Sequence, residues 1–107
     1  MSYTTQQITE LALLNDVCRT NWVDVVFTSN VLMGIHNHLG LAQAITEFND
    51  FNEDNDPYGK HDFGGLEWNG TKVYFKIDYY DQELKYGGDP LADDCRRVMT
   101  IMTAEEY

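Results

Sequence analysis

The chain of 107 residues is 43% hydrophobic and 13% aromatic, a globular composition that suffices for one hydrophobic core but not for two. Its 18 acidic and 7 basic side chains give a net charge of −11, and a surface of this sign repels phosphate backbones, so we expect no direct binding to DNA or RNA. No apolar run approaches the roughly 18 residues of a membrane span, and the first residues lack the basic and apolar regions of a signal peptide. We therefore expect a single cytoplasmic domain over residues 1–107 without membrane contact.

The first predicted element is an amphipathic helix over residues 5–20. Thr4 with Gln7 three positions later is a capping-box pattern, in which each side chain bonds the backbone of the other residue. Apolar side chains then recur at helical spacing and define one side of the helix: Ile8, Leu11, Leu14, Cys18 and Trp22. This pattern predicts a helix that packs on the rest of the fold through that side.

A strand and a second helix follow in the chain. Residues 23–28 are β-branched and apolar, which predicts a strand. Residues 31–38 are ambiguous between helix and strand. From Leu41 onward, apolar side chains at helical spacing predict a second helix that ends near Phe51. Residues 52–60 are predicted to form a loop.

The remainder of the chain predicts β structure. Residues 61–68 and 71–81 form a hairpin around Asn69-Gly70, a residue pair typical of a type I′ turn, and residues 96–103 form a last strand. Alternation in the second hairpin strand places Val73, Phe75, Ile77 and Tyr79 on one face and Lys72, Tyr74, Lys76, Asp78 and Tyr80 on the other. The predicted fold class is α+β, with two helices packed on one face of a small, mostly antiparallel sheet of about four strands.

Turn-forming residues and site-forming residues coincide in the segment 55–65. Asn-Asp-Pro and the glycines are turn formers, whereas histidine, carboxylates and aromatic rings are typical of binding and catalytic sites. Asn55, His61 and Asp62 are therefore candidate ligand-binding or catalytic residues, since a carboxylate beside His61 could orient the imidazole as a general base. The alternative is that these residues cap and pack a structural turn. No phosphate-binding loop, nucleophile elbow or catalytic triad motif accompanies them, so no catalytic residue is assigned.

The sequence predicts no metal and no cofactor. Asp50, Asn52 and Asp54 occupy the first, third and fifth positions of a calcium loop. Asn55, however, stands where that loop requires glycine, and His61 stands where it requires a bidentate glutamate. The two positions that a calcium loop depends on most therefore carry the wrong residues, so we interpret the segment as a solvated acidic loop.

Two cysteines, Cys18 and Cys95, lie far apart in the chain and outside any Cys-x-x-Cys motif. They could form one disulfide bridge. A cytosolic chain with two distant cysteines more often keeps both as small buried hydrophobic residues, and this is the expectation here.

The acidic excess is concentrated in two stretches. Seven carboxylates accompany one lysine between residues 47 and 67, and six accompany one lysine between residues 78 and 94. Aromatic rings crowd the same stretches, and rings among carboxylates are typical of protein interfaces that receive arginine and lysine. We predict a partner-binding surface formed by Asp50, Glu53, Asp54, Asp56, Tyr58, Glu67, Tyr74, Asp78, Tyr80, Asp81 and Glu83.

Several motifs together resemble a small bacterial family of unknown function, whose members are short proteins often found on plasmids and in phage-derived regions. The motifs are Asn55-Asp56-Pro57-Tyr58-Gly59, His61-Asp62-Phe63-Gly64, Lys76-Ile77-Asp78-Tyr79-Tyr80-Asp81, Leu14-Asn15-Asp16 with Arg19, Arg97-Val98-Met99-Thr100-Ile101-Met102, and Ala104-Glu105-Glu106-Tyr107. The resemblance covers nearly the whole chain. It implies no known activity and no catalytic residue.

Charge and resemblance together favour a binding module. We expect a small acidic protein that docks on a partner protein with a basic, nucleic-acid-binding surface. The most specific version of this hypothesis is an inhibitor from a phage or mobile element. Such an inhibitor would occupy the nucleic-acid-binding groove of a host defence complex by mimicking nucleic acid, as anti-CRISPR and anti-restriction proteins do. The alternatives are an enzyme or small-ligand binder centred on the segment 55–65, and a housekeeping protein whose acidity serves only solubility. The oligomeric state is not assigned.

Overall fold

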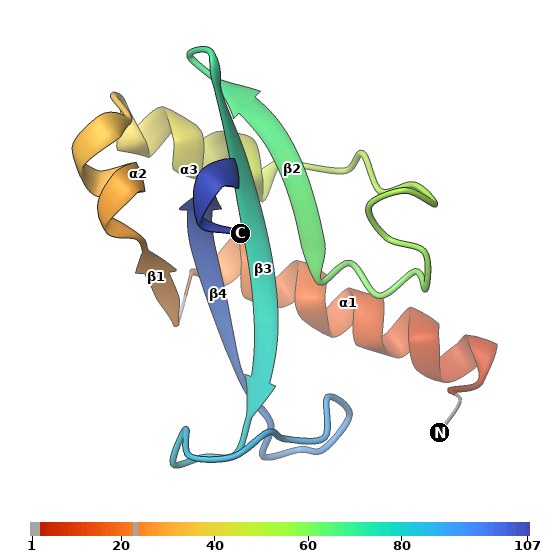
Figure 1. Ribbon diagram of the computed structural model, residues 1–107. Coiled ribbons are helices and arrows are strands. Elements are labelled where there is room, and N and C mark those ends of the chain that lie inside the picture. Colours follow the sequence, from red (N-terminus) through yellow and green to blue (C-terminus); the bar gives the residue numbers. More distant parts are fainter. Residues whose placement is uncertain (1–2, 23) are drawn as a thin grey trace.

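The structure is a computed structural model that describes residues 3–22 and 24–107. Its elements in chain order are α1 (Thr5–Asn21), β1 (Val25–Phe27), α2 (Ser29–Gly34), α3 (His38–Thr46), β2 (Phe63–Trp68), β3 (Thr71–Tyr80), β4 (Arg96–Thr103) and the 3-10 helix η1 (Ala104–Glu106), as Figure 1 shows. The strands form one sheet in the order β1-β4-β3-β2. β1 is parallel to β4 and the other neighbours are antiparallel, so the predicted α+β class with a mostly antiparallel sheet is confirmed.

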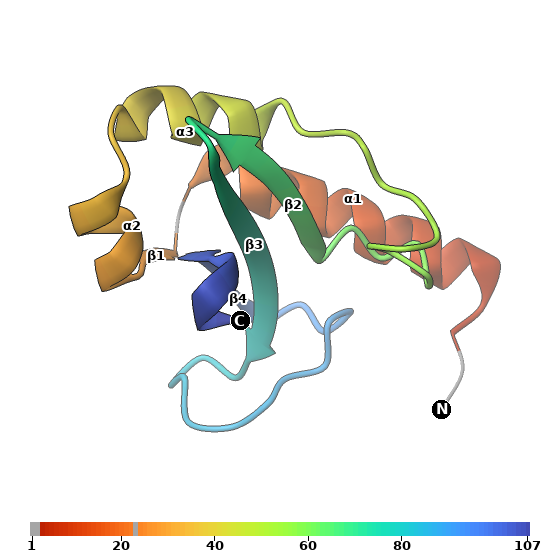
Figure 2. The same cartoon turned by 45° about the horizontal axis from the view of Figure 1, so that its top comes forward.

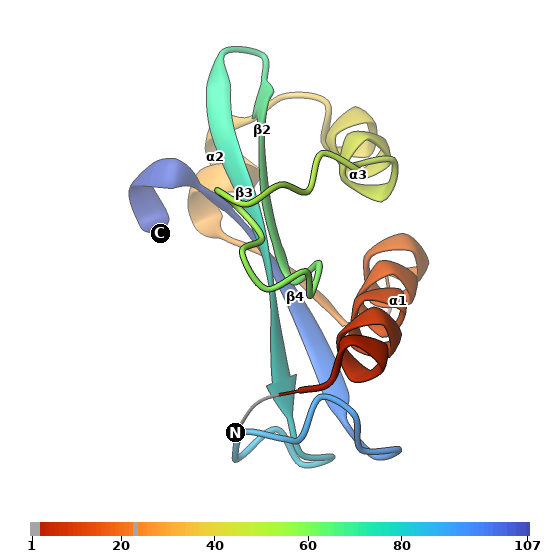
Figure 3. The same ribbon diagram turned by 90° about the vertical axis from the view of Figure 1, so that its right-hand side faces the viewer.

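The helices α1 and α3 cover one face of the sheet, and η1 lies on the other side (Figure 3). The short helix α2 lies beside β1 at one edge of the sheet (Figure 2). Between the helices and the sheet lies the core, where the alternation of β3 buries Val73, Phe75 and Ile77 as predicted. No helix within the described residues has the length and apolar character needed to cross a membrane.

The helix α1 is capped as predicted, and Leu11, Cys18 and Trp22 pack inward as predicted, but part of the buried side differs. The Gln7 backbone N–H donates to Thr4 Oγ1 at 3.1 Å, and the Thr4 N–H donates to Gln7 Oε1 at 2.8 Å. Leu14, which the apolar spacing places on the packed side, is 38% exposed, so that part of the pattern is wrong. Two polar residues, Asn15 and Arg19, are buried instead, because each bonds groups outside the helix.

The helix α3 begins and ends earlier than predicted. The Asn37 side chain caps it by accepting a hydrogen bond from the Gly40 N–H at 3.1 Å, which starts the helix at His38. The predicted extension to Phe51 is wrong, because Phe51 and Phe48 leave the helix and pack edge-on against Phe75, with ring centroids 6.3 and 5.2 Å away. The ambiguous residues 31–38 contain the end of α2 and the start of α3.

The β hairpin forms in the predicted register. Trp68 pairs with Thr71 across Asn69-Gly70, whose φ angles of 51° and 85° agree with the predicted type I′ turn. β2 begins at Phe63, later than predicted, because His61 has a φ of 60° that interrupts the extended backbone. The predicted bounds of the last strand are confirmed by β4. The first predicted strand is shorter, since β1 begins at Val25 and Val23 lies outside the described residues.

A bidentate ion pair joins the chain just before β1 to the start of β4. Arg96 Nε lies 2.9 Å from Asp24 Oδ2, and Arg96 Nη2 lies 3.2 Å from Asp24 Oδ1. The hydrogen bond from Arg96 holds the pKa of the Asp24 carboxyl below its ordinary value. The folded state therefore favours the ionised carboxylate more strongly than the unfolded chain does.

We expect this pair to shape the stability of the protein in acid. Because the folded pKa of Asp24 is depressed, its stabilisation is complete above the unfolded pKa of about 3.9 and is lost as the pH falls through the lower folded value. Asp24→Asn should lower the melting temperature by a few degrees at pH 7 and should weaken the acid dependence below about pH 4. Thermal melts of both proteins between about pH 2 and pH 7 measure this difference. Asp93→Asn, at an exposed position, is the control and should leave the profile unchanged.

Candidate functional site

A network of buried polar side chains joins α1 to β3, β4 and the loop between α3 and β2. Asn15, which is fully buried, donates from Nδ2 to the Lys60 carbonyl at 2.9 Å and to the Tyr79 hydroxyl at 2.8 Å. It accepts from Arg97 Nε at 2.7 Å, and the Tyr79 hydroxyl donates to Asp62 Oδ2 at 3.0 Å. Burial, reinforced by the Asp62 carboxylate, raises the pKa of Tyr79 far above its ordinary value. The hydroxyl therefore stays protonated and acts as a hydrogen-bond donor.

His61 is the second anchor of this loop. Its Nδ1 lies 3.0 Å from Asp16 Oδ1, and its Nε2 lies 3.8 Å from Asp56 Oδ2. The ring stacks on Phe51 with centroids 3.9 Å apart and planes 3° from parallel. The Asp56 side chain is only 5% exposed and accepts the backbone N–H groups of Lys60 and His61. Both ring nitrogens of His61 thus face carboxylates, and this geometry fits an anchor of the loop.

Amide side chains shape the first half of the same loop. Asn55 Nδ2 donates to the Asp50 carbonyl at 2.8 Å, and Asn55 Oδ1 accepts the Asn52 N–H at 2.9 Å. Asn52 Oδ1 in turn accepts the Asp54 N–H at 2.9 Å. These bonds replace a regular backbone ladder and leave Asp50 and Asp54 exposed. Over residues 3–22 and 24–107, no group of three or more His, Cys, Asp or Glu side chains is arranged to hold a metal ion.

A groove lies beside this loop, where β3 continues past the first residue of β2. The last pair between the two strands joins Phe63 to Lys76, so the following residues of β3 have no β2 partner. A pocket of about 400 Å³ lies there, and it adjoins a pocket of about 330 Å³ that shares Asp54, Asn55 and Phe63 with it. We name these two pockets together the acid–aromatic groove. Its carboxylate and aromatic lining consists of Asp50, Asp54, Asp62, Asp78, Phe63, Tyr74, Tyr79 and Tyr107.

Three rings form one wall of the acid–aromatic groove. Phe63 lies 5.0 Å from Tyr74 and 5.1 Å from Tyr107, and the two tyrosine rings are 5.4 Å apart. Two lysines of the chain itself show which contacts the groove offers to a cation: one lies over an aromatic ring and the other pairs with a carboxylate. Lys72 Nζ lies 5.9 Å from the Tyr74 ring centroid, and Lys76 Nζ lies 3.5 Å from Asp78 Oδ1. The groove therefore has the chemistry to receive ammonium or guanidinium groups.

The structure brings some of the predicted site residues together and separates others. The acid–aromatic groove contains Asp50, Asp54, Asn55, Asp62, Tyr74 and Asp78. Beyond it, where β3 enters the loop to β4, lie Tyr80, Asp81 and Glu83, and Asp81 Oδ1 accepts the N–H groups of Glu83 and Lys85. Outside both regions lie Glu53, Tyr58 and Glu67, all exposed. Asp56 and His61 are inside the loop and support it.

Sequence reasoning missed two parts of this region. It did not select Phe63, Tyr79 or Tyr107 as site residues, although all three line the groove. It also did not foresee that Asn15 and Arg19 would be buried. Arg19 donates to the Ile45 carbonyl at 3.1 Å and pairs with Asp16 at 2.9 Å. The sequence did carry one signal for this burial: Asn15 and Arg19 are one helical turn apart, on the side of α1 that also carries Leu11.

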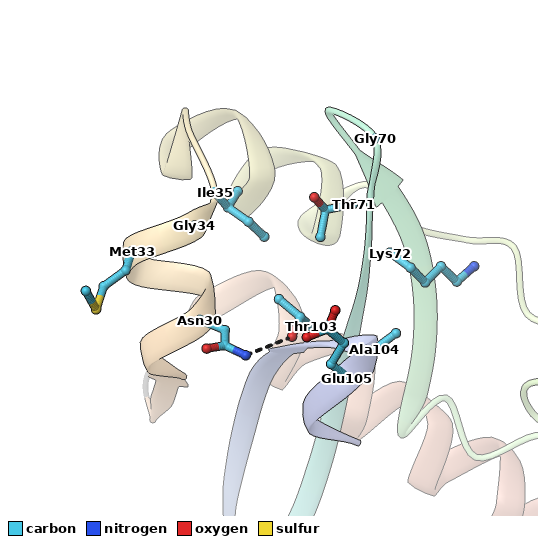
Figure 4. A pocket seen from close by; sticks show the side chains of 10 residues that line it. All are labelled: Asn30, Met33, Gly34, Ile35, Gly70, Thr71, Lys72, Thr103, Ala104 and Glu105. Carbon is cyan, nitrogen blue, oxygen red and sulfur yellow. Dashed lines mark hydrogen bonds between the residues drawn. The ribbon is translucent and has the colours of Figure 1, made fainter.

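A larger pocket lies elsewhere and contains none of the predicted site residues. Figure 4 shows this cavity of about 640 Å³ between α2, the hairpin turn and η1. The Asn30 side chain bonds Thr103 across it at 3.5 Å, and Thr103 also bonds Glu106. The Met33 and Lys72 side chains extend away from this pair to opposite sides (Figure 4). The residues that line this cavity include no aromatic ring and a single carboxylate, that of Glu105, so we assign the candidate site to the acid–aromatic groove.

Comparison with known proteins identifies a family and nothing finer. Residues 25–106 match the family described as Protein of unknown function (DUF3768). No curated protein and no solved structure matches the chain. The matched region begins at β1 and so leaves out α1, although α1 supplies Asn15, Asp16 and Arg19 to the network that supports the groove.

Proposed function

Because the chain belongs to the family Protein of unknown function (DUF3768), whose description assigns no activity, we propose a function from the chemistry of the site. The protein is an acidic binding module that docks on a basic surface of a partner protein through the acid–aromatic groove. The observation that carries this proposal is the meeting of four carboxylates and three packed aromatic rings, drawn from separate segments, around one groove that Lys72 and Lys76 also line.

The use of the chain's own arginines supports this proposal. Arg19 is buried and pairs with Asp16, Arg96 pairs with Asp24, and the Arg97 side chain bonds Asn15 within the fold. The exposed surface is therefore left with the acidic excess, and its field attracts basic partners over a distance set by ionic strength. Association through such a surface is fast and sensitive to salt.

In its most specific form, the proposal is that the partner's basic surface otherwise binds nucleic acid. The groove carboxylates, with Asp81 and Glu83 beyond them, would take the place of phosphates. The protein would then be an inhibitor from a phage or mobile element that blocks a host defence complex of the CRISPR or restriction type. Charge supports the first part, and the resemblance to plasmid- and phage-associated proteins supports the second.

The geometry supports binding over the alternative of catalysis at His61 and Asp62. Both His61 nitrogens lie close to carboxylates, and Asp62 accepts the Tyr79 hydroxyl. These contacts hold the loop against α1 and β3, which gives each residue a structural role. Asp62 also lines the groove, where its charge adds to the attraction for a cation.

We expect the purified protein not to retard duplex DNA or RNA at physiological salt. Its net charge of −11 opposes the approach of phosphates, and the adjacent Arg96 and Arg97 are both engaged in internal bonds. Gel retardation over a range of salt concentrations measures this. Saturable binding with a steep salt dependence would contradict the proposed use of the acidic surface.

Affinity capture from a bacterial host extract tests the proposal for protein partners. The bait is the full chain, and the matched bait carries Asp54→Lys and Asp78→Lys in the groove. We expect the wild-type bait to retain a basic, nucleic-acid-binding protein that salt elutes and that nucleic acid displaces, and we expect the variant to lose it. A partner held equally by both baits would show that binding does not use the groove.

A further inference from the structure

A pocket of about 310 Å³ between α1 and the start of β4 brings the two cysteines together. Cys18 in α1 and Cys95 just before β4 both line it, although they lie far apart in the sequence. Both thiols are free, and both side chains are half-buried rather than buried as expected. The pocket shares no residue with the acid–aromatic groove.

The contact between Asn15 and Arg97 accounts for the placement of both cysteines at one pocket. Arg97 Nε bonds Asn15 Oδ1 at 2.7 Å, which fixes β4 against α1 at this point. Cys18 lies about one helical turn after Asn15, and Cys95 lies two residues before Arg97. The helical period places Cys18 near the side of α1 that carries Asn15, and Cys95 directly precedes β4, so both cysteines lie at the junction of helix and strand.

Arg97 also influences both thiols. Burial raises the pKa of Cys18 and of Cys95, and the Arg97 charge opposes the rise at each of them. The Cys95 thiol contributes to the raised pKa of Cys18, as expected for neighbouring groups. Thiolates form less readily at these positions than on a free cysteine, so any reaction through them is slow at neutral pH and accelerates as the pH rises.

We propose that Cys18 and Cys95 are a redox pair that forms an intramolecular disulfide between α1 and the chain entering β4. The oxidant is a low-molecular-weight disulfide such as oxidised glutathione. One thiol loses its proton to solvent, and its thiolate attacks the oxidant, which forms a mixed disulfide and releases one glutathione thiolate. The second cysteine thiolate then attacks the protein sulfur of the mixed disulfide and releases the second glutathione. The protein loses two protons and two electrons, and the oxidant gains both as two glutathione thiols.

The disulfide would tie the acidic loop between β3 and β4 to α1. The bridge closes a long segment, from residue 18 to residue 95, and the loss of unfolded-state entropy grows with the length of the closed segment. The oxidised protein should therefore melt at least about 8 °C higher than the reduced protein. Reduction by a dithiol should reverse the change, so the pair would respond to the thiol–disulfide balance around the protein.

The test incubates the folded full chain with oxidised glutathione at several pH values and follows mass, free thiols and melting temperature. We expect a monomeric product that is lighter by two hydrogens, has no free thiol and melts at a higher temperature than the reduced protein. Its rate of formation should increase as the pH rises. Cys18→Ser and Cys95→Ser are the matched controls, and each should stop at the glutathione mixed disulfide without the rise in melting temperature.

Three results would overturn the proposal. Two glutathione adducts on the wild-type protein would show that the thiols do not reach each other. A bridge that formed only in denaturant, or that lowered the melting temperature, would show that the folded geometry opposes it.

Discussion

Asn15→Leu is expected to lower the free energy of unfolding by about 3–5 kcal/mol, measured by urea denaturation. Leucine has a similar size but bonds none of the three groups that Asn15 satisfies. The substitution leaves the Lys60 carbonyl, the Tyr79 hydroxyl and the Arg97 guanidinium without this partner in a region largely closed to water. Arg97 is half-buried and keeps its bond to the Pro90 carbonyl, so the largest penalty is the loss of hydrogen-bond partners for the groups that Asn15 satisfies.

Asn21→Leu is the matched control, because Asn21 is exposed at the end of the same helix. This change should alter the unfolding free energy by less than about 0.5 kcal/mol. If the two variants were equally stable, the buried network would not hold α1 to the sheet, and the support of the groove would need another explanation.

The second large effect is expected from charge reversal in the acid–aromatic groove. Asp54→Lys combined with Asp78→Lys should weaken binding of a short arginine-rich peptide by about 10-fold or more, measured by fluorescence anisotropy at low salt. Both carboxylates line the groove, so the change replaces attraction by repulsion where a guanidinium would dock. Raising the ionic strength should reduce the difference between the proteins.

The control for charge reversal keeps the net charge of that variant and moves the changes elsewhere. Glu10→Lys with Asp93→Lys alters two exposed carboxylates that do not line the groove. Long-range attraction falls equally in both double variants, so we expect the control to weaken binding by less than about threefold. Equal losses would mean that net charge alone, and not the groove, governs binding.

His61→Ala separates binding from catalysis in the same set of measurements. Loss of the contacts to Asp16 and Phe51 should lower stability, and the peptide affinity should change little where the loop stays folded. An enzyme centred on His61 would behave in the opposite way: activity would disappear while the melting temperature stayed normal. That pattern, together with active groove variants, would favour the catalytic alternative.

The β part of the fold could be predicted from the sequence because its signals are local. Alternation placed Val73, Phe75 and Ile77 in the core, and Asn69-Gly70 specified the turn that fixes the hairpin register. The packed side of α1 could not be predicted in the same way. Asn15 and Arg19 are polar, and their burial depends on partners from β4 and α3 that only the folded chain brings close.

The candidate site was predictable only where its signals are local in the sequence. Composition identified the acidic and aromatic stretches, which include Asp54, Tyr74 and Asp78. It could not show that β2 begins only at Phe63, so that the later residues of β3 have no β2 partner, or that Tyr107 folds back onto Tyr74. Those features follow from the positive φ of His61 and from contacts between distant segments.

Mapping the contacts of an arginine-rich peptide by nuclear magnetic resonance tests the central claim most directly. The measurement titrates the isotopically labelled full chain with the peptide and with a control in which citrulline replaces arginine, which removes the charge and keeps the shape. We predict that amide shifts move with saturation at Asp54, Asp62, Phe63, Asp78 and Tyr107, which line the groove, and only with the charged peptide. Shifts scattered over all exposed carboxylates, or equal shifts with both peptides, would contradict the assignment of the acid–aromatic groove as a binding site for basic protein segments.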